Sequence, residues 1–134
     1  MRLVHFSVQG NHIHLLIETT DNEALARGMQ GLSIRVAKAL NRVMRRRGRV
    51  FADHYHSRVL RTPTEAAWAL AYVLRNFAHH AKAWREEVAD GEADPFSSAA
   101  RGGADPPPVC EPRTWLLTAG WRRGVRPEGR ARAA

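Results

Sequence analysis

The sequence predicts an α+β domain in which helices pack on an antiparallel sheet. The first 18 residues alternate polar and apolar side chains on both sides of a glycine–asparagine turn, as a hairpin does. Two longer segments then repeat apolar residues every three or four positions, as amphipathic helices do. A short segment of strand-like composition lies between them, so the expected order is β-β-α-β-α.

The predicted hairpin joins a strand over residues 3–8 to a strand over residues 12–18. Gly10 and Asn11 between them form the dipeptide expected for a tight hairpin turn. Side chains alternate across a strand, so the two faces of the second strand are Ile13, Leu15 and Ile17 on one side, and His12, His14, Leu16 and Glu18 on the other. We expect the face of Ile13 to point to the core.

The first helix is predicted to begin at Thr20, which stands three residues before Glu23 at the spacing of a capping box. It should end at the cations and glycine of residues 45–48. Its apolar residues recur at helical spacing and are Leu25, Met29, Leu32, Val36, Leu40 and Val43. Residues 57–61 are then expected to add a third strand.

A second helix should start at residues 62–65, where threonine takes the cap, proline the first turn and glutamate the third position beyond the cap. It is predicted to run to about Val88. Its buried stripe should be Ala66, Leu70, Val73, Phe77 and Trp84.

Composition narrows the class of protein. At 134 residues the chain has the length of about one domain, and its formal net charge is +8. It has no run of about 18 apolar residues, its N-terminus lacks the apolar core of a signal peptide, and one cysteine cannot form an internal disulfide. We therefore expect a cytoplasmic protein that enters no membrane and binds an anionic partner, with nucleic acid the first candidate.

The charge is distributed unevenly about residue 90. Residues 1–89 hold 14 basic and 7 acidic residues and all seven histidines, whereas residues 90–134 hold 7 and 6. Residues 90–134 are also rich in proline and glycine, so we interpret them as a linker and a basic C-terminal tail after a domain over residues 1–89. One apolar stretch, residues 114–117 with Trp121 nearby, could dock back on that domain.

Two constellations could carry chemistry. His12 and His14 flank Ile13 in the second predicted strand, so both imidazoles can reach one metal ion. Two polar residues on a solvated face would give the same pattern. Tyr72 and Asn76 stand four apart on one face of the second helix. Tyrosine can be a nucleophile and an asparagine carbonyl suits Mg²⁺ or Mn²⁺, but taken alone a tyrosine at the edge of the core is the simpler explanation.

The end of the first helix holds five arginines with no acid among them: Arg42, Arg45, Arg46, Arg47 and Arg49. Such a run is usually a solvated helix end, but beside a metal site and a tyrosine it favours phosphate binding. His54 and His56 form a second pair at alternating spacing, and Tyr55 between them is a rival nucleophile.

Three segments, in order, resemble the IS200-like transposases. This family is the single-tyrosine branch of the HUH endonucleases and includes transposases associated with repetitive extragenic palindromes. Residues 10–18 are similar to its histidine–hydrophobe–histidine strand, and residues 48–57 to the segment between its middle helix and next strand. Residues 71–76 are similar to its catalytic helix, where an amide residue follows the tyrosine by four positions. The resemblance covers about residues 3–85.

The resemblance implies cleavage and joining of single-stranded DNA. Tyr72 would attack the scissile phosphate and leave a covalent 5′-phosphotyrosine and a free 3′-hydroxyl. His12, His14 and Asn76 would hold Mg²⁺ or Mn²⁺. The arginines of residues 42–49 would hold a DNA hairpin by its backbone.

The resemblance also implies a ferredoxin-like (RRM-like) sandwich. The family's domain usually begins well before its paired histidines, whereas this chain has eleven residues before His12. We therefore expect an N-terminally truncated chain without the first strand and helix, whose uncovered sheet a homodimer could fill. Two rival functions stay open: a non-catalytic nucleic-acid-binding remnant, and a small metal-dependent hydrolase that works without the tyrosine.

Overall fold

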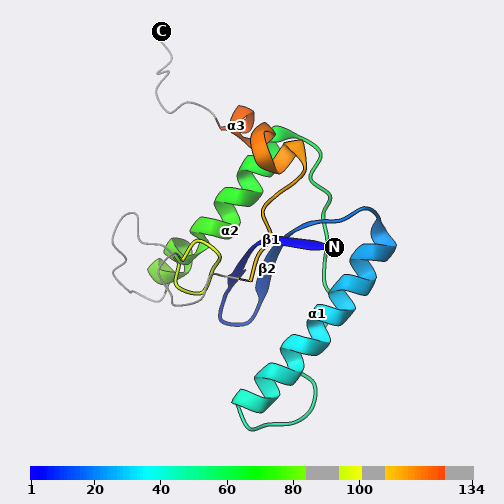
Figure 1. Cartoon of the computed structure of the whole chain (residues 1–134). Helices are drawn as coiled ribbons and strands as arrows, with labels where there is room; N and C mark the ends of the chain where they lie inside the picture. The colour runs from blue at the N-terminus through cyan, green and yellow to red at the C-terminus, as the bar shows by residue number, and fades with distance from the viewer. Residues whose placement is uncertain (84–93, 101–107, 126–134) are drawn as a thin grey trace. The chain divides into compact units, whose positions relative to one another are not determined.

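The computed structural model describes residues 1–83, 94–100 and 108–125 and confirms the α+β class. These residues form two compact units (Figure 1). One unit holds α1 (Asn22–Val43) and the segment that follows it as far as Val59. The other holds the strands β1 (Arg2–Val8) and β2 (Ile13–Glu18), the helix α2 (Pro63–Ala83), the π-helical turn η1 (Leu116–Gly120) and the short helix α3 (Trp121–Gly124). No helix in the described ranges is both long enough and apolar enough to cross a membrane.

The N-cap of α1 lies one residue later than predicted. Asp21, not Thr20, is the cap, and its carboxylate accepts a hydrogen bond from the backbone N–H of Ala24 at 2.7 Å. Thr20 supports this cap, because its hydroxyl donates to the second oxygen of Asp21 at 2.9 Å. The predicted end of α1 is confirmed: beyond the helix Arg45 has φ 50° and Gly48 has φ 102°, values that do not continue a helix.

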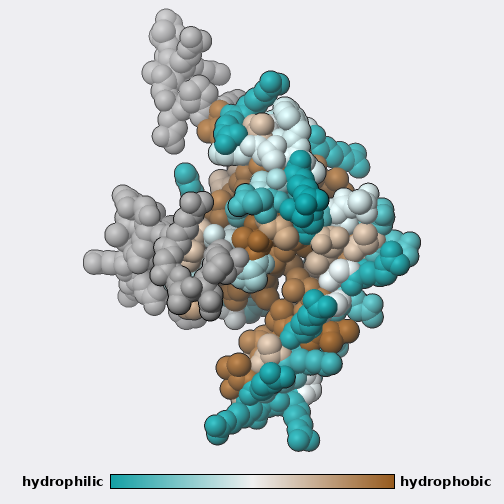
Figure 2. All heavy atoms as spheres, viewed as in Figure 1, coloured by the Kyte–Doolittle hydropathy of each residue, from teal (hydrophilic) through white to brown (hydrophobic). Residues whose placement is uncertain are grey.

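The apolar stripe of α1 is buried only in part. Met29 is 8% exposed, whereas Leu40 is 38% and Val43 is 80% exposed. The second half of α1 therefore presents apolar as well as basic side chains on its surface (Figure 2).

The hairpin forms as predicted. β1 and β2 pair antiparallel with Ser7 opposite His14. The backbone N–H of Gln9 donates to the carbonyl of His12 at 2.9 Å and closes the turn. This turn leaves His12 directly before β2 and His14 inside it.

The buried face of β2 is the one that carries histidine, contrary to the prediction. Leu16 is 6% exposed and belongs to the core with Val4 of β1 and Leu70 of α2. Ile13, on the opposite face, is only partly buried. Both faces of the strand carry apolar residues, so alternation alone does not decide which of them α2 covers.

The third strand expected at residues 57–61 is absent, and the sheet of the described residues has two strands. Val59 is 65% exposed, whereas its neighbour Leu60 is partly buried and packs against the core. The segment therefore contributes one side chain to the core but pairs with neither of the described strands.

The outer edge of β1 is covered by residues from the stretch interpreted as a linker. The backbone N–H of Val8 donates to the carbonyl of Phe96 at 2.9 Å, and the N–H of Ser98 donates to the carbonyl of Phe6 at 3.0 Å. These bonds satisfy backbone groups that an open strand edge would leave unpaired. The boundary expected at residue 90 lies outside the described residues.

α2 begins at the predicted capping box. The Thr62 hydroxyl accepts a hydrogen bond from the N–H of Glu65, and the Glu65 carboxylate accepts one from the N–H of Thr62, both at 3.2 Å. The stripe is confirmed where side chains are described, at Ala66, Leu70 and Val73. The side chain of Phe77, the residue Trp84 and the predicted end at Val88 lie outside the described part.

The C-terminal apolar stretch docks on α2, as predicted. Leu117 is 8% exposed and completes the core of this unit, and Leu116 and Trp121 pack against that core. Gly124 allows the end of α3 to approach the start of α2, since a Cβ at this position would collide with the carbonyl of Pro63. The C-terminal turns are therefore part of the fold that holds β2 and α2 together.

Replacing Leu117 tests this packing. We expect Leu117→Ala to lower the free energy of unfolding by about 2 kcal/mol, because it removes buried methyl groups from a small core that can partly relax. Urea denaturation followed by tryptophan fluorescence measures the loss. Val125→Ala is the control: Val125 is 54% exposed, and the change should stay within about 0.5 kcal/mol. Equal, small effects would show that η1 is not part of the core.

Candidate active site

Two histidines and a tyrosine lie side by side where β2 meets α2. The ring centroids of His12 and His14 are 4.6 Å apart, and those of His14 and Tyr72 are 4.8 Å apart. Both pairs meet nearly edge to face, with interplanar angles of 80° and 77°. All three residues belong to the same compact unit. Residues about 60 positions apart in the sequence thus form one row of polar rings.

This row exists because the face of β2 that carries the histidines is the face that α2 covers. His14 and Leu16 project from the same face of the strand, and Leu16 lies in the core under α2. The same helix that buries Leu16 therefore also passes His14, and Tyr72 is the residue of α2 that contacts it there. Had Ile13 pointed to the core, the histidines would lie on the side of the strand away from Leu70.

The surroundings of His12 favour one tautomer. Its Nδ1 lies 2.7 Å from the side-chain oxygen of Asn11, which can only accept, so Nδ1 is the donor. The lone pair of the neutral ring is then on Nε2. Metal-ligating histidines typically have this arrangement, in which the non-ligating nitrogen donates to an oxygen and fixes the ring.

Asn76 occupies the next turn of α2 after Tyr72. Leu16 shares the core with Leu70, and His14, two residues earlier, meets Tyr72, so α2 runs antiparallel to β2. Four helical residues advance about 6 Å and two strand residues about 6.6 Å. From this progression we expect the backbone of Asn76 near the level of His12. The side chain of Asn76 is outside the described part of the chain.

Imidazole is a ligand that Mn²⁺ and other divalent cations accept, so the chemistry of His12 and His14 is compatible with a metal ion. Among the described residues no group of three His, Cys, Asp or Glu side chains forms a metal-binding cluster. A metal ion at His12 and His14 would therefore need at least one further ligand of another kind.

Tyr72 is accessible. The residue is 53% exposed. Its ring meets that of His14 nearly edge to face, and the exposed remainder of the residue can be reached from solvent. Tyr72 is therefore not part of the buried core of α2.

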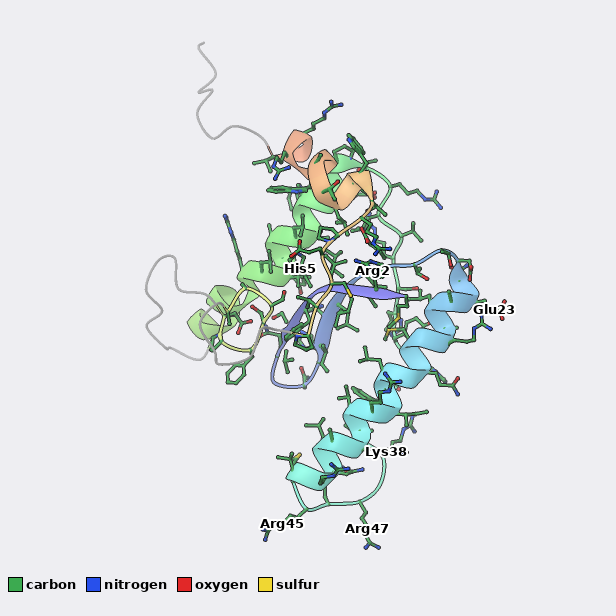
Figure 3. The ribbon with its side chains drawn as sticks, in the orientation of Figure 1. Arg2, His5, Glu23, Lys38, Arg45 and Arg47 are labelled. Carbon is green, nitrogen blue, oxygen red and sulfur yellow. The ribbon has the colours of Figure 1, made fainter. Side chains whose placement is uncertain are left out.

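The arginine-rich segment belongs to the other unit, at the end of α1. All five arginines are exposed, and Arg45 and Arg47 extend away from the ribbon (Figure 3). Arg46 and Arg49 stabilise the segment itself: Arg46 donates to the carbonyl of Arg49 at 3.0 Å, and Arg49 to that of Phe51 at 2.7 Å. Arg42, Arg45 and Arg47 form no ion pair with a described acid, which leaves their charge for a phosphate backbone.

The other histidines of the described part have different settings. His54 and His56 lie with Tyr55 in the irregular segment after α1, where all three are exposed. His5 of β1 lies 3.0 Å from the Ser98 hydroxyl, and this bond ties the covering segment to β1. Burial lowers the pKa of His5, and the charge of Glu111 opposes this shift.

One exposed residue beside the site was not anticipated. Trp68 stands one helical turn before Tyr72 and is 74% exposed. Its spacing of four residues from Tyr72 is the signal that could have found it.

The comparisons with known proteins identify no relative. No protein-family model matches this chain, and neither a curated protein nor a solved structure matches it.

Proposed function

We propose that this chain nicks and rejoins single-stranded DNA through a covalent bond to Tyr72. The observation that carries the proposal is the row of His12, His14 and Tyr72 rings, in which an exposed tyrosine lies beside a histidine pair. A hydroxyl nucleophile beside candidate metal ligands is the arrangement that phosphodiester attack requires. The resemblance to IS200-like transposases names the same residues for this chemistry.

The reaction exchanges one ester bond for another. The Tyr72 oxygen forms a bond to phosphorus, and the bond between phosphorus and the 3′ oxygen breaks. The tyrosine loses its proton and the 3′ oxygen gains one, which leaves a 5′-phosphotyrosine and a free 3′-hydroxyl. The reverse attack by a 3′-hydroxyl restores a phosphodiester, so joining needs no external energy source. A divalent cation held by His12, His14 and Asn76 would stabilise the negative charge that builds on the phosphate oxygens.

The charge of the chain fits a DNA substrate. The formal net charge is +8, and three exposed arginines at the end of α1 lack a described acid partner. Arginine binds phosphates without reading base sequence, so this segment would hold a DNA hairpin by its backbone.

The test is formation of a covalent adduct. The full chain is incubated with Mn²⁺ and hairpin-bearing single-stranded DNA that is labelled on the 3′ side of its cleavage site. We expect a labelled protein–DNA species that survives denaturing electrophoresis and is absent in EDTA. Tyr72→Phe should abolish it, because the variant keeps the ring but lacks the nucleophilic oxygen. Tyr55→Phe is the matched control and should form the adduct, since Tyr55 is an exposed tyrosine of the other unit.

Two results would replace the proposal with a rival. DNA binding without an adduct in any protein would favour a non-catalytic nucleic-acid-binding remnant. Metal-dependent turnover that survives Tyr72→Phe would favour a hydrolase that uses the histidines without the tyrosine.

A further inference from the structure

The exposed face of α2 carries two aromatic residues and an arginine at helical spacing: Trp68, Tyr72 and Arg75. Trp68 is 74% and Tyr72 53% exposed, and Arg75, three residues further, is also exposed. Residues three and four apart on a helix are neighbours, so the three side chains share one surface. Ala66, Leu70 and Val73, on the opposite face, are buried in the core. Core packing therefore accounts for one face of α2 and leaves Trp68 unexplained.

Charge on this surface suits a polyanion. Between Pro63 and Arg75 the only acid of α2 is Glu65, and its carboxylate accepts hydrogen bonds from the backbone of Arg61 and Thr62 at the cap. No carboxylate of this stretch is thus left beside Tyr72 to repel phosphate. Arg75 can pair with a phosphate oxygen one turn from the tyrosine.

We propose that Trp68 stacks a nucleobase of single-stranded DNA next to the phosphate that Tyr72 attacks, with Arg75 on the backbone. An exposed indole face is the platform that unpaired bases use in proteins that bind single strands, and every base has a face to offer. Bases within a duplex are already stacked on one another, so this contact selects an unpaired segment. The inference rests on the proposed function for its placement beside the reacting phosphate.

Stacking on Trp68 would position the substrate. Trp68 and Tyr72 have Cβ atoms about 5–6 Å apart, as residues four apart on a helix do. A base held on Trp68 therefore fixes the neighbouring sugar–phosphate over the tyrosine ring. Trp68 is then a positioning residue, because it touches the DNA but not the bonds that change.

The test measures binding separately from cleavage. All proteins carry Tyr72→Phe and contain no metal, and fluorescence anisotropy measures the dissociation constant for two DNAs: a hairpin with a single-stranded flank and the same hairpin without it. We expect Trp68→Leu to weaken binding of the flanked hairpin by at least about fivefold. Trp68→Phe should restore most of the affinity, since phenylalanine keeps an aromatic face. The blunt hairpin should bind all variants equally.

Trp115→Leu is the matched control, because Trp115 is a 53% exposed tryptophan elsewhere in the same unit. It should leave both dissociation constants unchanged. Unchanged binding of the flanked hairpin by Trp68→Leu would overturn the proposal, as would an equal loss for the blunt hairpin or for Trp115→Leu. If Trp68 contacts another protein and not DNA, Trp68→Leu should leave binding of the flanked hairpin unchanged.

Adduct formation separates this proposal from the proposed function. With Tyr72 intact, an adduct whose yield is the same in wild type and Trp68→Leu would overturn the stacking contact and leave cleavage standing. No adduct in any protein, with the Trp68 dependence of binding intact, would support the stacking contact and overturn cleavage.

Discussion

Replacing both His12 and His14 with alanine should lower metal-dependent adduct formation at least about a hundredfold. Their rings lie 4.6 Å apart, and they are the two candidate metal ligands whose side chains are described at the site. A bound cation contributes several kcal/mol of charge stabilisation in the transition state, and each 1.4 kcal/mol corresponds to tenfold in rate. Binding of hairpin DNA should persist, because the arginines at the end of α1 are unchanged. Adduct yield and anisotropy on the same samples measure the two effects.

A second pair of histidines, also separated by one residue, provides the control for His12 and His14. His54 and His56 also flank a single residue, but they lie in an exposed irregular segment of the other unit. Replacing both with alanine should leave adduct formation and Mn²⁺ binding unchanged, as calorimetric titration with Mn²⁺ can show. If this second pair proves to be the one needed for Mn²⁺ binding, His12 and His14 do not hold the metal and the proposed mechanism is wrong.

The hairpin and the start of α2 could be predicted from the sequence because the residues that form the turn and the helix cap are close to one another in the chain. The turn at Gly10 and Asn11 and the reciprocal bonds of Thr62 and Glu65 each involve residues at most a few positions apart. The cap of α1 was misplaced by one residue because Thr20 and Asp21 are both good capping residues. Sequence spacing does not rank them, whereas the observed bond to Ala24 does.

Long-range contacts decide what the sequence pattern left undetermined. The residues 3–8 and 12–18 alternate in a way that allows either face to be buried, and the position of α2 selects the face of Leu16. Residues 57–61 have a strand-like composition, but they have no partner in the described sheet. The bonds of Ser98 to β1 join residues more than 90 positions apart, and no local pattern encodes them.

In the candidate site, too, some relations follow from local spacing and others from long-range contacts. Spacing alone placed His12 beside His14 and Asn76 one turn after Tyr72. The contact between His14 and Tyr72 depends on the antiparallel course of α2 along β2, which spacing does not reveal. Trp68 lies outside the predicted buried stripe, and its exposure of 74% in the structure marks it as a candidate contact.

Glu18→Gln should lower the free energy of unfolding by about 3 kcal/mol. Glu18 is 7% exposed, and its carboxylate accepts hydrogen bonds from the N–H of Arg113, the N–H of Thr114 and the Thr114 hydroxyl, at 2.7–3.0 Å. Its ion pair with Arg2 is 3.7 Å long. A glutamine would turn an N–H₂ group toward some of these donors, and breaking a buried charged network has a cost of this size. Glu23→Gln is the control, since Glu23 and Arg27 form an exposed pair worth at most about 0.5 kcal/mol.

The effect of Glu18 should disappear in acid. Burial raises the pKa of Glu18, but the hydrogen bonds from Thr114 and Arg113 and the charge of Arg2 outweigh it and hold the pKa below its usual value of 4.5. A carboxyl whose pKa is lower in the folded state stabilises the fold above the unfolded pKa and loses this contribution as the pH falls through the folded pKa. Denaturation of wild type and Glu18→Gln should therefore differ fully at pH 7, and the difference should shrink as the pH falls below 4.5 and through the folded pKa. A difference that is constant from pH 7 to pH 3 would show that the charge of Glu18 does not hold the C-terminal turns on the hairpin.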